Sequence, residues 1–464
     1  MVEKNASPGS PETLLSSLEE TIQALMQKTQ VPGVVVGIFT QGQEHTIGLG
    51  LTSIENPLEV DAETLFQVGS TTKVITATAA LRLVERGKLE LDQPVRHYLP
   101  DLHLGSSEVT THVTLRHLLT HTGGWEGDYF EDLGPGNDAL AAYVANLTSL
   151  RQITPLGAAW SYNNTGFSIT GRLIEVVTGK PYESAIKELV FDPLGMHHTF
   201  FFAHDAITYR VAVGHVFSAN GRFVARPWAL PRTVWPAGGV VAPVRDLLRF
   251  VRFHLREGTT EDGTRLLSKE LLAHMQSEQI PTGGARESIG LAWFLKQVDG
   301  VRLVNHQGET LGQAAALLLV PEHDFALIIL TNAQSGTLLI EAVTKWVLEH
   351  YFGAKESEPI PQERTDEEIA PYLGVYASTL GDFDVSLQNG QLMVQYLPKI
   401  GFPTKDDPPP PPPPPLPVAF SDRDRLVVLA SPLKGATADF LRKPDGSIGW
   451  FRVMRRVAAR QEHT

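Results

Sequence analysis

The chain has 464 residues, of which 42% are hydrophobic and 20% charged, and its formal net charge is -13. This length suggests about three domains, and the composition is ordinary for a globular protein that buries large cores. The acidic balance argues against nucleic acid and anionic membranes as partners, because both require a basic surface. No stretch approaches the roughly 20 apolar residues of a membrane helix. Since the chain has no cysteine, it can have neither disulfides nor thiol chemistry.

Residues 1–11 are polar and lack the apolar core of a signal peptide. This predicts a cytoplasmic protein, or a periplasmic or secreted one if a leader has been removed. Residues 14–26 have the periodicity of an amphipathic helix, and residues 33–39 and 44–49 predict two strands joined by a Gln-Gly turn. A mainly helical part follows, from about residue 71 to residue 257. Its predicted helices are residues 71–86, 115–119, 138–147, 165–178, 182–190 and 244–256.

Strands return in the third quarter of the chain. They are predicted at residues 289–296, 302–305, 313–320 and 325–331, and a helix at residues 338–351 ends this part. Strands near both ends therefore flank a helical insert. We predict an α+β fold in residues 1–353, in which terminal helices flank an antiparallel sheet and a helical subdomain lies beside it. We expect a ligand pocket between these two layers.

The last quarter of the chain predicts a separate domain. Residues 354–365 are polar and proline-containing, which is typical of a linker. Residues 366–464 contain short alternating segments that predict a small all-β barrel. Its predicted strands are residues 372–378, 383–388, 391–396, 426–429, 437–441 and 448–453. Eight consecutive prolines at 408–415 must form a polyproline helix, which we interpret as a stiff exposed loop rather than a ligand for an SH3-type partner.

A serine followed three residues later by a lysine places a hydroxyl and an amine one helical turn apart. Such a pair can supply a nucleophile and the base that activates it. The pattern occurs three times, as Ser70/Lys73, Ser184/Lys187 and Ser431/Lys434. Ser70 opens a predicted helix after Val68-Gly69, where free backbone N–H groups can stabilise an oxyanion. Ser184 lies inside an ordinary surface helix and Ser431 in a strand-rich segment, so we select Ser70.

Two further motifs follow Ser70-Thr71-Thr72-Lys73 in order. Tyr162-Asn163-Asn164 precedes a predicted helix, and His306-Gln307-Gly308 follows an apolar strand. The chain therefore resembles the serine β-lactamase and penicillin-binding-protein superfamily, whose motifs are S-x-x-K, Y-x-N, and K-T-G or H-x-G. It is most similar to the class-C-like branch of lactamases, esterases and D-amino-acid peptidases. Residues 114–124, 191–196 and 236–239 are also similar to segments of that family, and some members carry a C-terminal, lipocalin-like β-barrel.

The resemblance implies a role for each motif residue. Ser70 would attack a carbonyl and become acylated, and Lys73 or Tyr162 would remove its proton; the sequence leaves open which of the two is the base. Asn164 would donate to Lys73 or to a substrate carbonyl, or serve as a helix N-cap. His306 and Gly308 would contribute to substrate binding. The backbone N–H groups of Ser70 and Glu309 would form the oxyanion hole.

The third motif departs from the K-T-G pattern, because His306 replaces a permanent cation. Histidine is charged only when protonated, so a fixed charge for an acidic substrate group is lost. We therefore predict a serine hydrolase for small esters, amides or D-amino-acid peptides, with weak or no β-lactamase activity. The alternatives are a penicillin-binding sensor with little turnover, and a scaffold that recruits partners through the β-domain and the prolines. The β-domain could also support a homo-oligomer.

We expect neither a cofactor nor a metal. His117 and His121 have the i, i+4 spacing of a zinc motif, but no glutamate follows His117, so we predict structural roles for both.

Overall fold

The computed structural model describes residues 11–218, 221–283, 287–401, 408–431 and 433–461. Residues 1–10, on which the expectation about a signal peptide rests, lie outside this part. The chain folds as two compact units. The first contains Met1–Thr120, Tyr129–Thr148 and Asn164–Glu356, and the second contains His121–Asp128, Ser149–Asn163 and Ser357–Thr464. The limits 1–353 and 366–464 remain a prediction, and the second unit holds two segments from the first of these ranges.

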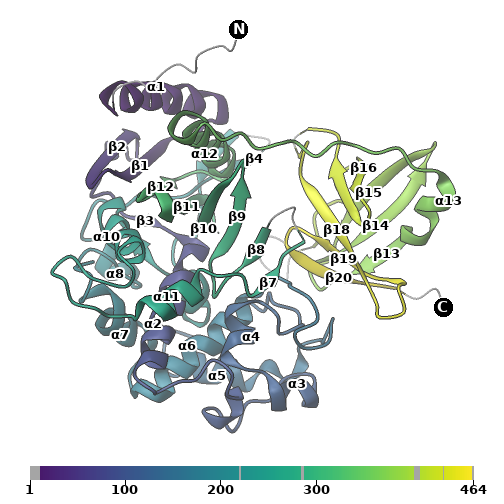
Figure 1. Cartoon of the computed structure of the whole chain (residues 1–464), viewed down its shortest axis with the longest axis horizontal. Helices are drawn as coiled ribbons and strands as arrows, with labels where there is room; N and C mark the ends of the chain where they lie inside the picture. The colour runs from purple at the N-terminus through teal and green to yellow at the C-terminus, as the bar shows by residue number, and fades with distance from the viewer. Residues whose placement is uncertain (1–10, 219–220, 284–286, 402–407, 432, 462–464) are drawn as a thin grey trace. The chain divides into compact units, whose positions relative to one another are not determined.

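The first unit is built on one eight-stranded antiparallel sheet with the order β2-β1-β12-β11-β10-β9-β8-β7 (Figure 1). Strands from both ends of the unit pair with each other, for example Val36 with Ile329. This confirms the expected α+β fold. The strands are β1 (Gly33–Thr40), β2 (Gln43–Gly50), β7 (Ile280–Pro281), β8 (Glu287–Ile289), β9 (Phe294–Val298), β10 (Val301–Thr310), β11 (Gln313–Val320) and β12 (Phe325–Thr331).

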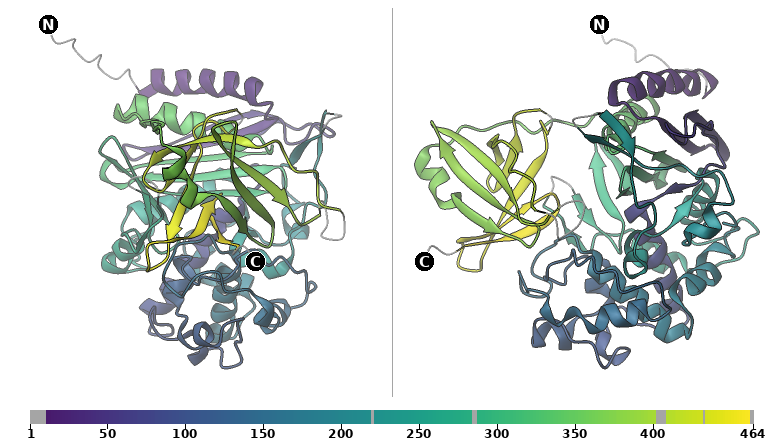
Figure 2. Two further views of the ribbon diagram at one scale, coloured as in Figure 1. Left: turned by 90° about the vertical axis from the view of Figure 1, so that its right-hand side faces the viewer. Right: turned by 180° about the vertical axis from the view of Figure 1, so that it is seen from behind.

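The helices α1 (Pro11–Thr29) and α12 (Gly336–Phe352) lie side by side on one face of this sheet (Figures 1 and 2). Leu18 and Ile22 of α1 and Val343 of α12 are buried there with alternate residues of β11, such as Ala316 and Leu318. Removing apolar side chains of this size from water contributes about 1.5–3 kcal/mol each. Because side chains alternate across a strand, the remaining residues of β11 face the helical layer instead.

The helical layer of the first unit follows the predicted pattern with shorter elements. The predicted helix at 71–86 is α2 (Thr72–Glu85), preceded by the short 3-10 turn η1 (Gly69–Thr71). The first unit also contains two small strand pairs, β3 (Phe66–Gln67) with β6 (Val241–Ala242) and β4 (His215–Ser218) with β5 (Gly221–Val224). The other helices are α3 (Ser107–His112), α4 (Leu115–Leu119), α5 (Ala139–Ala145), α6 (Asn164–Thr178), α7 (Tyr182–Ile186), α8 (Ala203–Ala206), α9 (Trp235–Gly238), α10 (Val244–Leu255) and α11 (Lys269–Met275).

Two strand predictions are wrong in an informative way. Residues 289–296 form not one strand but the end of β8, a turn and the start of β9. The turn is closed by the N–H of Gly290, which donates to the carbonyl of Trp293, and Ala292 takes a left-handed φ of 71°. Conversely, the strand predicted at 302–305 extends to Thr310, so the third motif lies within β10 rather than after it. When the residues of a turn are themselves buried and apolar, the hydrophobic pattern of the sequence does not distinguish the turn from a strand.

The second unit contains a closed eight-stranded barrel of strands β13 to β20. Its core is aromatic and includes Tyr376, Phe420, Phe440 and Phe451. The sequence missed β16 and β20, because β16 directly follows the prolines and β20 follows a turn without glycine. The strands are β13 (Gly374–Ala377), β14 (Gly381–Gln388), β15 (Gln391–Pro398), β16 (Leu416–Asp422), β17 (Arg425–Val428), β18 (Thr437–Arg442), β19 (Ile448–Val453) and β20 (Arg456–Arg460).

The polyproline run lies between β15 and β16. Pro408 to Pro414 are exposed, and the side chain of Gln395 donates to the carbonyl of Pro413 at 3.2 Å. The short helix α13 (Asp366–Ile369) precedes the barrel and has a capping box formed by Thr365 and Glu368. None of the helices in the described part of the chain combines the length and the apolar character that crossing a membrane requires.

One buried histidine makes the first unit sensitive to acid. His254 of α10 is packed against Phe250, Phe253 and Trp293. Its Nε2 lies 3.2 Å from Thr78 Oγ1, and that hydroxyl donates to a carbonyl of its own helix, so the imidazole must donate. Burial lowers the pKa of His254 to about 3. The imidazole is therefore neutral in the folded chain.

The unfolded chain binds a proton at His254 near pH 6.5, whereas the folded chain does so only near pH 3. Stability from this group is complete above pH 6.5 and is lost as the pH falls below it. The unfolding free energy of the wild-type protein should fall between pH 7 and pH 5. We predict that this fall is about 2 kcal/mol smaller in His254→Leu. Urea unfolding followed by tryptophan fluorescence measures this, with the exposed His204→Gln as control. An unchanged pH dependence in His254→Leu would contradict the assignment.

Candidate active site

Ser70 lies in η1, immediately before α2, as the sequence predicted. The turn is fixed by its neighbours, because the N–H of Val68 donates to the carbonyl of Val240 at 3.0 Å and the N–H of Val240 donates to Thr72 Oγ1 at 3.1 Å. Gly69 takes a left-handed φ of 52°, which glycine adopts without strain. Ser70 itself stays half-buried. The turn therefore presents the Ser70 hydroxyl at the start of a helix whose first N–H groups have no partner within the helix.

Lys73 is fully buried, and its amine lies among three oxygen atoms. Its Nζ lies 3.1 Å from Ser70 Oγ, and it donates to Asn164 Oδ1 at 2.6 Å and to the carbonyl of Ala237 at 2.7 Å. The ring of Phe167 lies 5.5 Å away. Burying a charged or polar nitrogen is costly unless it is hydrogen-bonded, and these contacts provide that compensation. They hold the nitrogen within hydrogen-bond reach of the Ser70 hydroxyl.

Asn164 is the first residue of α6 and lies almost completely buried. Its side-chain oxygen accepts from Lys73, so the direction of this hydrogen bond is the reverse of the one predicted from sequence. The sequence does not predict the contact with the carbonyl of Ala237, although residues 236–239 are similar to a segment of the family. A backbone carbonyl has no signature in the residue type, so no sequence signal could have found it.

The third motif lies against the Ser70 turn. A Cβ added to Gly308 would lie 2.1 Å from the carbonyl oxygen of Val68 and 2.8 Å from Ser70 N. A Cβ added to Gly69 would lie 2.6 Å from Glu309 N. Only glycine at both positions permits this approach of β10 to η1. The backbone N–H groups of Ser70 and Glu309 are thereby brought to one place, as an oxyanion hole requires.

His306 is buried on the sheet face that α1 and α12 do not cover. It pairs with Leu317, which faces the helical layer, whereas the neighbouring Gln307 pairs with Ala316 of the opposite core. The Nδ1 of His306 lies 2.6 Å from the carbonyl oxygen of Gln307, and the ring of Phe294 lies 5.2 Å away. The side chain is 1% exposed. The position of the K-T-G lysine thus holds a buried imidazole.

Tyr162 belongs to the second unit. Its ring stacks on His121 at 4.5 Å, and its backbone N–H donates to the carbonyl of Arg455 at 2.8 Å. His121 in turn accepts from the N–H of Asn163 through Nδ1 at 2.9 Å. His117 caps α4 through Thr114. Both histidines therefore serve structural contacts, and the described residues contain no group of three or more histidine and carboxylate side chains arranged to hold a metal.

The other two serine–lysine pairs differ from Ser70 and Lys73. Ser184 is exposed on α7, and Lys187 forms an ion pair with Asp192. Ser431 lies in a turn after β17, where helical spacing does not apply. Neither pair has a buried amine beside the hydroxyl.

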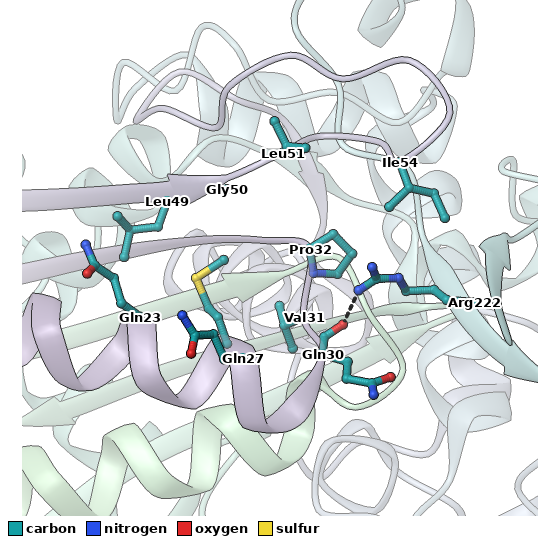
Figure 3. A pocket seen from close by; sticks show the side chains of 11 residues that line it. Gln23, Gln27, Gln30, Val31, Pro32, Leu49, Gly50, Leu51, Ile54 and Arg222 are labelled. Carbon is teal, nitrogen blue, oxygen red and sulfur yellow. Dashed lines mark hydrogen bonds between the residues drawn. The ribbon is translucent and has the colours of Figure 1, made fainter.

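A hollow of about 900 Å³ lies elsewhere in the first unit, between the end of α1, β2 and Arg222 (Figure 3). The side chains around it are mainly apolar or are those of Gln23, Gln27 and Gln30, and Arg222 donates to the carbonyl of Gln30 at 2.6 Å. None of the residues around it can act as a nucleophile or as a general base.

Comparison with known proteins finds relatives both in sequence and in structure. The Beta-lactamase family profile matches residues 18–347. Penicillin-binding protein 4 of Amycolatopsis lactamdurans is 33% identical, over 77% of this chain and 96% of its own length. The crystal structure of SurE with D-Leu has a TM-score of 0.77 at 23% identity and covers 97% of this chain and 100% of its own. A class C beta-lactamase has a TM-score of 0.62 at 22% identity and covers 74% and 98%.

The two structural likenesses show a shared fold, and the matches of the profile and of the Amycolatopsis protein show the family. The chain belongs to the beta-lactamase family of serine hydrolases, which confirms the resemblance drawn from the motifs.

Gly308→Ala tests the contact between β10 and the Ser70 turn. The added methyl group must displace Val68 or Ser70 by an ångström or more. We predict a loss of about 1–3 kcal/mol in unfolding free energy and a fall of about 10²-fold in acylation rate as the two N–H groups separate. Stopped-flow acylation by a chromogenic ester measures the rate. Gly449→Ala is the control, since the three atoms nearest to its added methyl group all belong to the flexible Lys443 side chain. A normal acylation rate in Gly308→Ala would contradict the assignment of the oxyanion hole.

Proposed function

We propose that this member of the beta-lactamase family forms an acyl-enzyme at Ser70 and hydrolyses small esters, amides or peptides containing D-amino acids, with weak or no β-lactamase activity. The observation that carries the proposal is the buried Lys73 amine, 3.1 Å from Ser70 Oγ and held by two further oxygen atoms. A serine hydroxyl is a poor nucleophile unless a base lies within hydrogen-bond reach.

In the first step Ser70 Oγ forms a bond to the substrate carbonyl carbon, and its proton passes to Lys73 Nζ. The carbonyl electrons move onto the oxygen, where the N–H groups of Ser70 and Glu309 stabilise the negative charge. As the carbonyl reforms, the bond to the leaving group breaks and the leaving group takes the proton from Lys73. Water then attacks the acyl-enzyme by the same route, and its proton returns to Ser70 Oγ as the acid departs.

Tyr162 is included in this proposal because it is close in the chain to a residue that binds Lys73. Only Asn163 separates it from Asn164, which accepts from Lys73, and two residues span at most about 7 Å. We infer that the Tyr162 hydroxyl shares this proton with Lys73 until the leaving group takes it. Two groups that share one proton titrate as a unit. In this proposal Lys73 and Tyr162 therefore act together as the base.

The substrate class follows from His306. A lysine at this position would hold a substrate carboxylate at every working pH, whereas an imidazole is charged only when it is protonated. The His306 side chain is also buried, and the ring of Phe294 lies beside it. Neutral esters and amides therefore fit better than cephalosporins with their carboxylate. That the SurE structure was solved with D-Leu supports the inclusion of D-aminoacyl substrates.

A second candidate is a penicillin-binding protein that is acylated with little turnover, which the name of the Amycolatopsis relative favours. Deacylation distinguishes the two. A hydrolase shows a burst followed by steady turnover, whereas a binding protein stops after the burst.

The proposal requires covalent chemistry at Ser70. We predict that a fluorophosphonate labels Ser70, identified by peptide mass spectrometry, and that Ser70→Ala abolishes both labelling and ester hydrolysis. Ser184→Ala is the matched control, because Ser184 has the same spacing to a lysine but lies exposed with that lysine paired to Asp192. It should keep full activity. Labelling at Ser184 or Ser431 with Ser70 unmodified would refute the proposal.

The substrate class is tested by comparing kcat/KM for a cephalosporin, a D-aminoacyl amide and a neutral ester. We predict that the cephalosporin is at least about 10²-fold poorer than the ester, a difference of about 2.7 kcal/mol in transition-state stabilisation. His306→Lys should reduce the difference in kcat/KM between the ester and the cephalosporin. Gln307→Lys adds the same charge on the opposite face of β10 and should leave that difference unchanged. Equal kcat/KM values for the cephalosporin and the ester in the wild-type protein would exclude this role of His306.

A further inference from the structure

The hairpin formed by β19 and β20 makes a set of contacts that the family motifs do not explain. Its strands hydrogen-bond to the segment Ser149–Asn163, which belongs to the same compact unit. The side chain of Trp450 donates to the carbonyl of Ile153 at 2.8 Å, that of Arg452 to the carbonyl of Trp160 at 3.3 Å, and the N–H of Val457 to Ser161 Oγ at 3.1 Å. The barrel therefore holds the stretch of chain that ends in the Tyr162 motif.

Tyr162 itself contacts the tip of this hairpin. Met454 and Arg455 form the turn with φ values of 50° and 66°, and the carbonyl of Arg455 accepts from the N–H of Tyr162 at 2.8 Å. The guanidinium group of the next residue, Arg456, lies 5.3 Å from the centre of the Tyr162 ring. Together with the stacked ring of His121, these contacts restrict both the backbone and the ring of Tyr162.

Arg456 is itself fixed by Asp128. Its Nε donates to Asp128 Oδ2 and its Nη2 to Asp128 Oδ1, the latter at 3.1 Å. The Asp128 side chain is 7% exposed. A bidentate pair of this kind sets the plane of the guanidinium as well as its position. The plane in contact with the tyrosine ring is therefore determined by a carboxylate from a different segment of the chain.

We propose that the Arg456–Asp128 pair and the hairpin that carries it are positioning elements for Tyr162. This inference rests on the proposed role of Tyr162 in moving the proton of Ser70. A phenol that exchanges a proton must stay within hydrogen-bond reach of its partner, and small displacements of a catalytic group cost large factors in rate. The C-terminal barrel thereby takes part in the reaction without contributing a group that touches the substrate.

The barrel contains a matched control for this inference. Arg442 forms a bidentate pair with Asp424, with Nε at 3.0 Å and Nη2 at 2.7 Å from the carboxylate, and its guanidinium lies 5.8 Å from the ring of Tyr372. The bidentate ion pair beside a tyrosine ring matches that of Arg456 and Asp128, and Arg442 and Asp424 also hydrogen-bond the Tyr372 hydroxyl. Tyr372, however, packs into the barrel core and belongs to no motif. Loss of this pair should destabilise the barrel to a similar degree with no effect on the reaction.

The test is a double-mutant cycle on the full-length protein, measured as the single-turnover acylation of Ser70 by p-nitrophenyl acetate. We expect Arg456→Gln and Asp128→Asn each to lower the saturating rate constant about tenfold or more, with the half-saturating ester concentration within threefold of wild type. In the Tyr162→Phe background the same changes should alter the rate less than twofold, because the hydroxyl they position is absent. Arg442→Gln should leave the rate unchanged in either background.

Equal rate losses in the tyrosine and phenylalanine backgrounds would overturn the inference, as would an unchanged rate in Arg456→Gln or an equal loss in Arg442→Gln. If circular dichroism shows that Arg456→Gln does not fold, the same rate comparisons are made with the nearly isosteric Asp128→Asn. Absence of any Ser70 acylation in the wild-type protein would instead refute the proposed function. The two failures are therefore distinguishable.

Discussion

The buried amine of Lys73 is the interaction on which the rest of the site depends. An amine with no access to water must find its hydrogen-bond partners within the protein. Asn164 and the carbonyl of Ala237 serve as two of them, and each anchors a different element, α6 and α9, beside α2. The hydrogen bonds of one nitrogen thus connect three helices. They also hold that nitrogen 3.1 Å from the hydroxyl of Ser70.

A second constraint is the close contact between β10 and the Ser70 turn. Gly69 and Gly308 remove the side chains that would separate them, so two backbone segments meet without any catalytic side chain between them. An oxyanion hole at this place would therefore depend on packing distance rather than on residue chemistry. Its N–H groups lie on a helix start and on a strand of the central sheet, both of which are rigid, and rigidity is what electrostatic stabilisation of a transition state requires.

The second unit combines segments that are far apart in the sequence. The segment Ser149–Asn163 lies between two helices of the first unit in sequence, yet it packs with the barrel that ends the chain. The contact is made by side chains of Trp450 and Arg452 to backbone carbonyls, which any sequence in the segment would provide. Residues of the barrel at the end of the chain thereby contact a motif almost 300 residues earlier.

Ser70, Lys73, Asn164 and Gly308 could be selected from the sequence because their spacing and order carry the chemistry, and the alternation and length of the apolar runs determined the sheet and its covering helices. The sequence could not supply the turn at Gly290–Trp293, since its residues are as apolar as the strands beside it. Nor could it supply the carbonyl of Ala237 or the pair of Arg456 with Asp128. Each of these depends on which backbone and which charges meet across hundreds of residues. Local patterns determine what a segment can form, whereas only tertiary packing decides which distant groups satisfy its buried polar atoms.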